Sequence, residues 1–392
     1  MDLIDDDELN QKLQSINKKI DEDLNKSCQS VLQKIDEIKY KLSDNSISFI
    51  QEKKIFLRKF YEKKYNIIPK IQMIPENNDN HLNYFINVVL FILANIETLS
   101  QFCLEEKYKE ILKKLGNNET HFITLFIDLI KNMYIAKNNN INITPIHNFL
   151  KSEINKDYIS YECQNPSILI NKILDYLEKD IKKTNEKNVI TNNFSANLKT
   201  MKMCIKCQIL TEINTEKKFI IDLYVKQTVK KDLPEEMVSI QKDLLKDEAL
   251  EKKKFPCPTC KQNMTVYRTI ENSKNYLIFN IDRNKNVQNP IKIKYSTELK
   301  LTEEKDYDHV YELILALTDK NINILNQNAN NNNNINDQVN CVLFFKNFIK
   351  DKWYILVNGI YKDFHGNIKD ELNKRTPNIL IYKKKSIKYG KQ

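Results

Sequence analysis

Two short stretches decide the fold, M-C-I-K-C-Q at residues 203–208 and F-P-C-P-T-C-K-Q at residues 255–262. Each contains a C-x-x-C pair, and the two pairs share the same spacing although they lie far apart in the chain. Two such pairs converging from distant stretches form a tetrahedral thiolate site, the usual donor set of a structural zinc ion. The alternative is two pairs of buried or disulfide-bonded cysteines. We predict a structural zinc ion with four ligands: Cys204, Cys207, Cys257 and Cys260.

The composition predicts a soluble globular protein. The chain has 392 residues, enough for two or three domains or one large domain with insertions. It is 41% hydrophobic and 29% charged, and its most apolar run, residues 85–94, is too short to span a membrane and contains Asn87. The acidic start, M-D-L-I-D-D-D-E, resembles neither a secretory signal nor a transit peptide.

The other four cysteines are scattered and form no disulfide framework, which indicates a reducing intracellular compartment, cytoplasm or nucleus. They are Cys28, Cys103, Cys163 and Cys341.

The net charge of +10 comes mostly from evenly spread Lys, and the chain has only four Arg residues. Proteins that recognise specific nucleic-acid sequences usually have clustered basic patches and use the forked guanidinium group of Arg to bind bases and phosphates. The charge therefore says little about partners, and without such patches we do not expect nucleic acid as a direct ligand. A zinc-ribbon nucleic-acid-binding protein remains the second alternative, carried by the cysteine pairs and the charge.

Apolar residues recur at three-and-four spacing over residues 9–42, which predicts an amphipathic helix with coiled-coil character in its second half. We interpret residues 1–65 as an N-terminal arm for partner binding or self-packing, followed by a linker at 66–80. The alternative is a helix that folds back on the main domain.

The rest of the chain predicts an α+β fold. Helical spacing dominates the first part, including one helix from Leu82 to Leu99, and alternation typical of strands begins near residue 198. Residues 321–337 form an Asn-rich stretch that predicts a disordered loop.

Several segments resemble motifs of the ubiquitin-specific protease (USP) family of deubiquitinases, in the family's order. C-Q-N-P-S-I-L-I-N-K-I-L-D-Y-L (163–177) is similar to the helix Q-Q-D-A-x-E-F-L-x-x-L-L-D-x-L. Y-L-I-F-N-I-D-R-N (276–284) resembles the strand ending L-K-R-F, and Y-E-L-I-L-A-L (311–317) the strand Y-x-L-x-A-V. W-Y-I-L-V-N (353–358) and P-N-I-L-I-Y (377–382) resemble W-Y-x-F-D-D and A-Y-x-L-F-Y.

The resemblance implies a papain-like fold of thumb, palm and zinc-bearing fingers over residues 81–385, with fingers at about 198–270. It also implies a cysteine protease site, in which a histidine activates a thiol and a third group orients the histidine. Aligned to the family motifs, the nucleophile position is Tyr84, the oxyanion-stabilising position Leu82 and the histidine position Asn340. The orienting position falls at Val357 or Asn358.

Neither a phenol nor an amide can replace the thiol and imidazole near neutral pH, and Leu82 has no hydrogen-bond donor. No other cysteine has a matching motif: Cys28 lies in the N-terminal heptads, and neither Cys103 nor Cys163 has the family's surrounding residues. We expect the remaining histidines to be surface or capping residues: His121, His147, His309 and His365.

The sequence thus predicts a catalytically inactive, USP-like pseudoenzyme. It would act as a protein-binding or scaffold subunit of a larger assembly, docked through the N-terminal helix, with ubiquitin binding either retained or lost. The first alternative is an active thiol-dependent deubiquitinase with an unrecognised nucleophile.

Overall fold

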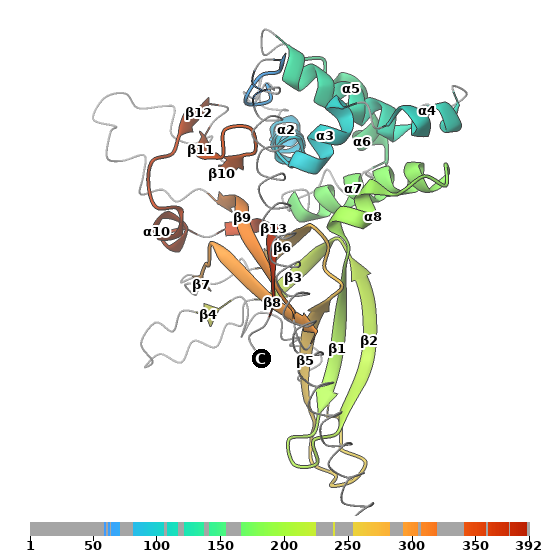
Figure 1. Cartoon of the computed structure of the whole chain (residues 1–392), viewed down its shortest axis with the longest axis vertical. Coiled ribbons are helices and arrows are strands. Elements are labelled where there is room, and N and C mark those ends of the chain that lie inside the picture. The colour runs from blue at the N-terminus through green and yellow to red at the C-terminus, as the bar shows by residue number, and fades with distance from the viewer. Residues whose placement is uncertain are drawn as a thin grey trace, which may run out of the picture. The chain divides into compact units, whose positions relative to one another are not determined.

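Figure 1 shows the computed structural model of the chain, which divides into two compact units, Met1–Lys64 and Tyr65–Gln392. The described residues lie almost wholly in the second unit: 59, 62, 64–70, 81–105, 108–116, 121–136, 141–153, 166–224, 238–239, 254–282, 293–304, 307–319, 341–357, 360–375 and 377–389. Most of the predicted N-terminal arm, most of the linker and the whole Asn-rich loop fall outside them. Those assignments and the domain boundaries therefore stay predictions.

The first part of the second unit is helical, as the apolar spacing predicts. Its helices are α2 (His81–Ala94), α3 (Glu97–Leu104), α4 (Lys109–Leu115), α5 (Phe122–Ile135), α6 (Thr144–Glu153), α7 (Pro166–Lys182) and α8 (Val189–Phe194). Helix α5 contacts α3, α6 and α7, while α2 contacts α3 and α7. Residues 86–94 of α2 are buried on every side, which marks it as the central helix of the group.

The single helix predicted from Leu82 to Leu99 is wrong, because the chain breaks between α2 and α3. The Ala94 carbonyl accepts the hydroxyls of Ser100 (2.5 Å) and Tyr134 (2.7 Å) instead of continuing the helical ladder. The Thr98 amide, freed from that ladder, donates to the Tyr276 hydroxyl at 3.4 Å. Side chains distant in sequence thus satisfy the broken turn.

No single helix among the described residues is long and apolar enough to cross a membrane. Residues 86–94 together with α3 meet the length and composition criteria only as a pair bent by 80°.

Strands dominate the remainder and confirm the predicted α+β class. The largest sheet, which we call the palm sheet, has eight strands in the order β12-β11-β10-β9-β13-β6-β3, with β8 also paired to β9. Its strands are β3 (Ile220–Tyr224), β6 (Tyr276–Asp282), β8 (Glu298–Glu304), β9 (Tyr307–Asp319), β10 (Cys341–Asn347), β11 (Lys352–Val357), β12 (Ile360–Asp363) and β13 (Pro377–Tyr389). The short helix α10 (Ile368–Asn373) precedes β13.

The strands of the palm sheet contribute most residues of the main apolar core in the strand-rich part. Residues far apart in sequence meet there, among them Phe279 of β6, Phe344 of β10 and Tyr382 of β13, all at most 1% exposed. All neighbouring strands are antiparallel except β3 and β6, which are parallel. Strand β13 lies in the interior of the sheet, between β9 and β6.

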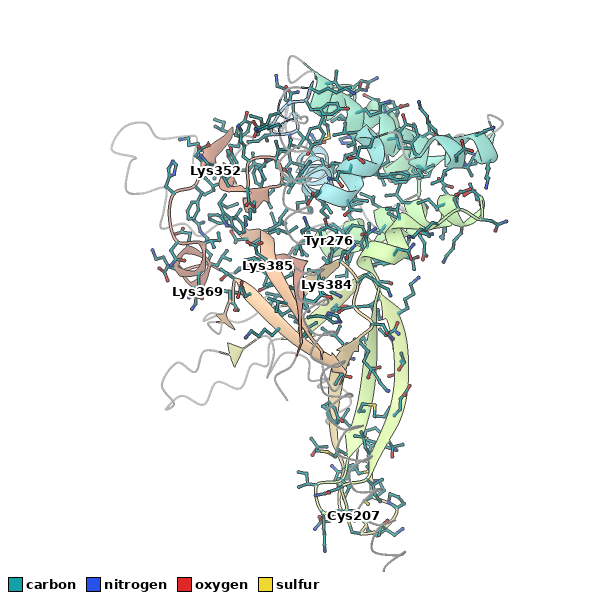
Figure 2. The ribbon with its side chains drawn as sticks, in the orientation of Figure 1. Cys207, Tyr276, Lys352, Lys369, Lys384 and Lys385 are labelled. Carbon is teal, nitrogen blue, oxygen red and sulfur yellow. The ribbon has the colours of Figure 1, made fainter. Side chains whose placement is uncertain are left out.

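Polar contacts join the helices to the palm sheet. Lys383 of β13 forms an ion pair with Glu97 of α3, and Thr98 Oγ1 lies 3.1 Å from the Tyr276 hydroxyl of β6. Figure 2 labels Tyr276, which lies where the helices meet the sheet. These contacts fix the start of α3 on the sheet.

A separate three-stranded antiparallel sheet, the finger sheet, projects from the palm sheet in the order β2-β1-β5 (Figure 1). It comprises β1 (Ala196–Met203), β2 (Leu210–Lys218) and β5 (Thr265–Glu271). Two short strands, β4 (Val238–Ser239) and β7 (Ile293–Lys294), pair in parallel elsewhere.

Candidate functional site

The finger sheet brings both C-x-x-C pairs to one place. Met203, the last residue of β1, is paired with Leu210 of β2 and with Thr265 of β5. Cys204 and Cys207 lie in the turn between β1 and β2, and the second pair lies just before β5. Figure 2 shows Cys207 at the outer end of the finger sheet, which we call the fingertip (residues 202–210 and 254–265).

The two cysteine turns have the same backbone geometry. The Cys204 amide donates to the carbonyl two residues after Cys207, at 2.9 Å, and the Cys257 amide donates to the equivalent carbonyl at 2.8 Å. The residue after the second cysteine is left-handed in both turns, with φ of 55° at Gln208 and 60° at Lys261. The repeated geometry curls each pair so that both thiols of a turn point to a common centre.

The four sulfurs fit a zinc ion. All lie within 4.8 Å of one another, and the Cys204 and Cys260 sulfurs are 3.5 Å apart. A tetrahedral centre with Zn–S bonds of about 2.3 Å requires sulfur–sulfur separations of about 3.8 Å, whereas a disulfide requires about 2.05 Å. All five cysteines with described side chains are free, so the disulfide alternative is wrong for these pairs. The four thiols could hold zinc.

The thiols influence one another strongly. The Cys260 backbone amide donates to the Cys257 sulfur and, against the effect of burial, helps to lower the Cys257 pKa to about 6. A hydrogen bond with the Cys260 side chain instead raises the Cys207 pKa to about 12. Without a metal, the cluster therefore favours a thiolate at Cys257. A bound divalent cation would attract negative charge and so favour deprotonation of the other three thiols.

The fingertip has only a small apolar core. Cys204, Cys257 and Met264 are buried, and the partly buried residues packed on them include Ile209 and Phe255. The Met264 amide donates to the Phe255 carbonyl at 2.8 Å, which ties the second cysteine turn to β5.

The helix α2 connects the helical core to the palm sheet. Asn87 Oδ1 lies 2.9 Å from His147 Nε2 of α6, and both side chains are buried. One helical turn later the Phe91 ring makes an edge contact with Phe345 of β10, with centroids 5.2 Å apart. The turn of α2 from Asn87 to Phe91 is thus held between α6 and the palm sheet.

Residues 78–373 match the protein family described as ubiquitin carboxyl-terminal hydrolase. The chain belongs to this family. No curated protein sequence matches it. Among solved structures it resembles the SAGA DUB module of Ubp8, Sgf11, Sus1 and Sgf73 bound to monoubiquitin. That match has a TM-score of 0.59 and 16% identity over 82% of this chain and 70% of that chain.

Two further structures give similar values. The same module bound to ubiquitin aldehyde matches with a TM-score of 0.58 and 16% identity, over 82% of this chain and 70% of that one. A yeast SAGA DUB module with a variant Sgf73 gives 0.55 and 13%, over 83% and 70%. At these identities the likeness shows the fold, and it is the predicted USP fold.

The alignment to the family's motifs places the nucleophile position in α2. Leu82 and Tyr84 lie in the first turn of α2. Their side chains are outside the described residues, as are Asn340 and Asn358 entirely. Of the described residues beside these positions, Cys341 begins β10, and Val357, the other candidate for the orienting position, ends β11. Val357 is paired with Val342 in the β10–β11 ladder. The start of β10 and the end of β11 therefore lie side by side.

The other cysteines and histidines that were predicted to be non-catalytic differ in their burial. Cys103 is fully buried, and burial raises its pKa far above the usual range of a thiol. His121 and His147 are also buried. His121 is the N-cap residue of α5, without a capping bond from its side chain, and His147 lies within α6, so the expectation of a surface or capping residue is wrong for His147. His309 is half-buried, and His365 is exposed. Cys28 and Cys163 lie outside the described residues. Sequence spacing gave no signal for the His147–Asn87 contact.

Proposed function

We propose that the chain is a catalytically inactive member of its family that acts as a protein-binding subunit of a larger assembly. One contrast carries the proposal. Every predicted zinc ligand is present and converges, whereas the aligned nucleophile and base positions hold Tyr84 and Asn340. Metal ligands maintained beside lost catalytic groups indicate a fold in use for something other than hydrolysis.

The chemistry of these positions supports inactivity. A phenol with a pKa near 10 is a weak nucleophile, and a neutral amide cannot take up its proton. Leu82 at the oxyanion position offers no donor to a developing negative charge. Among the described cysteine side chains, that of Cys103 lies outside the fingertip, and it is too buried to replace the missing thiol.

Zinc has a structural role in this proposal. Four thiolates leave no open coordination position for substrate or water, so the ion would stabilise the fingertip rather than take part in hydrolysis. Cys204, Cys207, Cys257 and Cys260 would hold it.

The proposal includes protein partners. The matching SAGA structures contain Ubp8 with three partner subunits, and two of them contain ubiquitin or its aldehyde. We infer that this chain likewise works with protein partners inside the cell, through its N-terminal arm, and that ubiquitin is a candidate ligand. The free cysteines suit a reducing compartment.

A ubiquitin–fluorophore cleavage assay tests inactivity. The wild-type chain, loaded with zinc, should release no fluorophore beyond the rate of buffer. Turnover that disappears when one cysteine outside the fingertip is changed, with Cys103→Ala as the first variant, would instead establish an active deubiquitinase. Circular dichroism of each variant, together with its zinc content, excludes a trivial loss of fold.

A second measurement asks whether ubiquitin is still bound. Titrating the chain into isotope-labelled ubiquitin should shift a contiguous set of ubiquitin amide signals if binding persists. Unchanged spectra at millimolar concentration would show that the surface serves other partners only.

A further inference from the structure

The fingertip exposes large apolar side chains where none is needed for packing. Ile205 is 75% exposed, Leu210 53% and Met203 38%. These are three of the seven strongly exposed large apolar residues in the described part of the chain. Single exposed apolar residues are ordinary on protein surfaces, but a cluster in one place marks an interaction site.

The three side chains are held together by the finger sheet and the cysteine centre. Met203 and Leu210 are directly opposite each other in the β1–β2 ladder, so they share one face. Ile205 lies between Cys204 and Cys207, within the first cysteine turn. Figure 2 shows this end of the finger sheet away from the palm sheet and the helices. The cluster is therefore preorganised, which lowers the entropy cost of binding.

Lysines surround the apolar cluster. Lys206, Lys254 and Lys261 are exposed, and Lys202 lies over the Phe255 ring, 5.5 Å from its centroid. Residues 200–211 and 254–270 contain no Asp or Glu at all. The first nearby carboxylate, Glu212, lies 3.3 Å from Lys199, nearer the base of the finger sheet. The fingertip thus presents positive charge that no acidic residue of these two segments offsets.

We propose that the fingertip is a docking surface for an acidic protein segment with aliphatic side chains. The lysines would pair with the carboxylates, while Ile205, Leu210 and Met203 would bury the aliphatic groups. A single-stranded nucleic acid fits this surface less well, since it prefers stacking aromatics and Arg, whereas the exposed apolar residues here are all aliphatic. The proposal holds whether or not the domain cleaves ubiquitin conjugates.

Fluorescence anisotropy with defined probes tests the proposal on the full, zinc-loaded chain. The main probe is a short labelled peptide that alternates Asp or Glu with Leu or Ile. One control peptide replaces the acids with Lys, and a second replaces Leu and Ile with Ser. A labelled single-stranded oligonucleotide and labelled ubiquitin complete the set. Only the acidic aliphatic peptide should bind strongly at about 0.15 M salt.

Variants locate the binding site. Ile205→Ser with Leu210→Ser, and separately Lys206→Glu with Lys261→Glu, should each weaken peptide binding by about tenfold or more. The matched control is Ile360→Ser with Lys362→Glu on β12, where Ile360 is 64% exposed, and it should leave binding unchanged. Each variant must retain its zinc.

Three outcomes would overturn the proposal. The first is peptide binding that survives both fingertip variants. The second is binding of the oligonucleotide, lost in the Lys variant and steeply salt-dependent, with no binding of the peptide. The third is binding of ubiquitin alone at the fingertip.

Discussion

The palm sheet and the finger sheet of this chain are stabilised in different ways. The palm sheet has a core of many buried apolar and aromatic side chains drawn from strands across the sheet. The finger sheet exposes β2 along nearly its whole length, and at its tip only Cys204, Cys257 and Met264 are buried. Small units that cannot bury enough apolar surface are commonly fixed by a metal or a disulfide. At the fingertip, the cysteine centre therefore takes the place of a larger apolar core.

Removing the metal ligands should have the largest effect, confined to the finger sheet. In Cys204→Ser, we expect zinc to be lost and fingertip amides to exchange about 10,000-fold faster, because the binding free energy of a structural metal is folding free energy. Palm amides should keep their protection. Hydrogen exchange with mass spectrometry measures both regions in one sample.

The control for the metal prediction is Cys103→Ala, which changes a buried cysteine outside the fingertip and should leave zinc bound. A fingertip that keeps its protection after zinc has been stripped would show that apolar packing suffices there.

Truncating a palm core side chain should produce the opposite pattern. Phe344 is fully buried, with its ring 5.4 Å from that of Phe364 and 5.2 Å from the Arg375 guanidinium. We expect Phe344→Ala to lower the free energy of unfolding by about 3–5 kcal/mol. Denaturant unfolding measures this change, and metal analysis of the folded variant should still find zinc. Loss of zinc in the native variant would mean that the two regions are coupled.

An intermediate effect is expected where α7 meets the base of the finger sheet. Burial disfavours the charged Glu178 carboxylate. Its hydrogen bonds with Lys182 and Lys217 (2.8 Å each) and Thr191 (2.5 Å) nevertheless lower the Glu178 pKa to about 2. Glu178→Gln should cost about 1–2 kcal/mol at pH 7.

The stabilisation by Glu178 should depend on pH, and the direction of its pKa shift fixes the direction of that dependence. Because the folded-state pKa lies below the ordinary 4.5, the stabilisation is present above pH 4.5 and is lost as pH falls toward 2. The stability difference between wild type and Glu178→Gln should therefore shrink over that range in urea unfolding. A difference that is constant with pH would point to packing rather than charge.

The smallest effect concerns the left-handed residues of the two cysteine turns. Gln208 and Lys261 adopt a conformation that favours glycine. Gln208→Gly or Lys261→Gly should slow fingertip hydrogen exchange slightly, equivalent to a gain of up to about 1 kcal/mol. Lys206→Gly, which lies outside the positive-φ set, should give no gain. Equal behaviour of all three variants would show that backbone strain is not felt at the fingertip.

The sequence predicts best where one local pattern decides the structure. The C-x-x-C spacing located the four sulfurs of the candidate metal site, and apolar periodicity located most helices and strands. The sequence predicts the structure poorly where contacts between residues far apart in the chain determine it. The break after Ala94 depends on Tyr134 and Tyr276, and the ion pair of Glu97 with Lys383 joins residues 286 positions apart. No local spacing encodes such contacts. The roles of Tyr84 and Asn340 rest on alignment alone.

The position of β13 has a consequence for synthesis. This strand is the last one described, yet it lies between β9 and β6 in the interior of the palm sheet. On a ribosome, the earlier strands emerge first and their edges stay unpaired until residues 377–389 are released. Exposed strand edges promote misassembly, so this domain should depend on chaperones late in translation. A premature stop before Pro377 would split the sheet instead of trimming its edge.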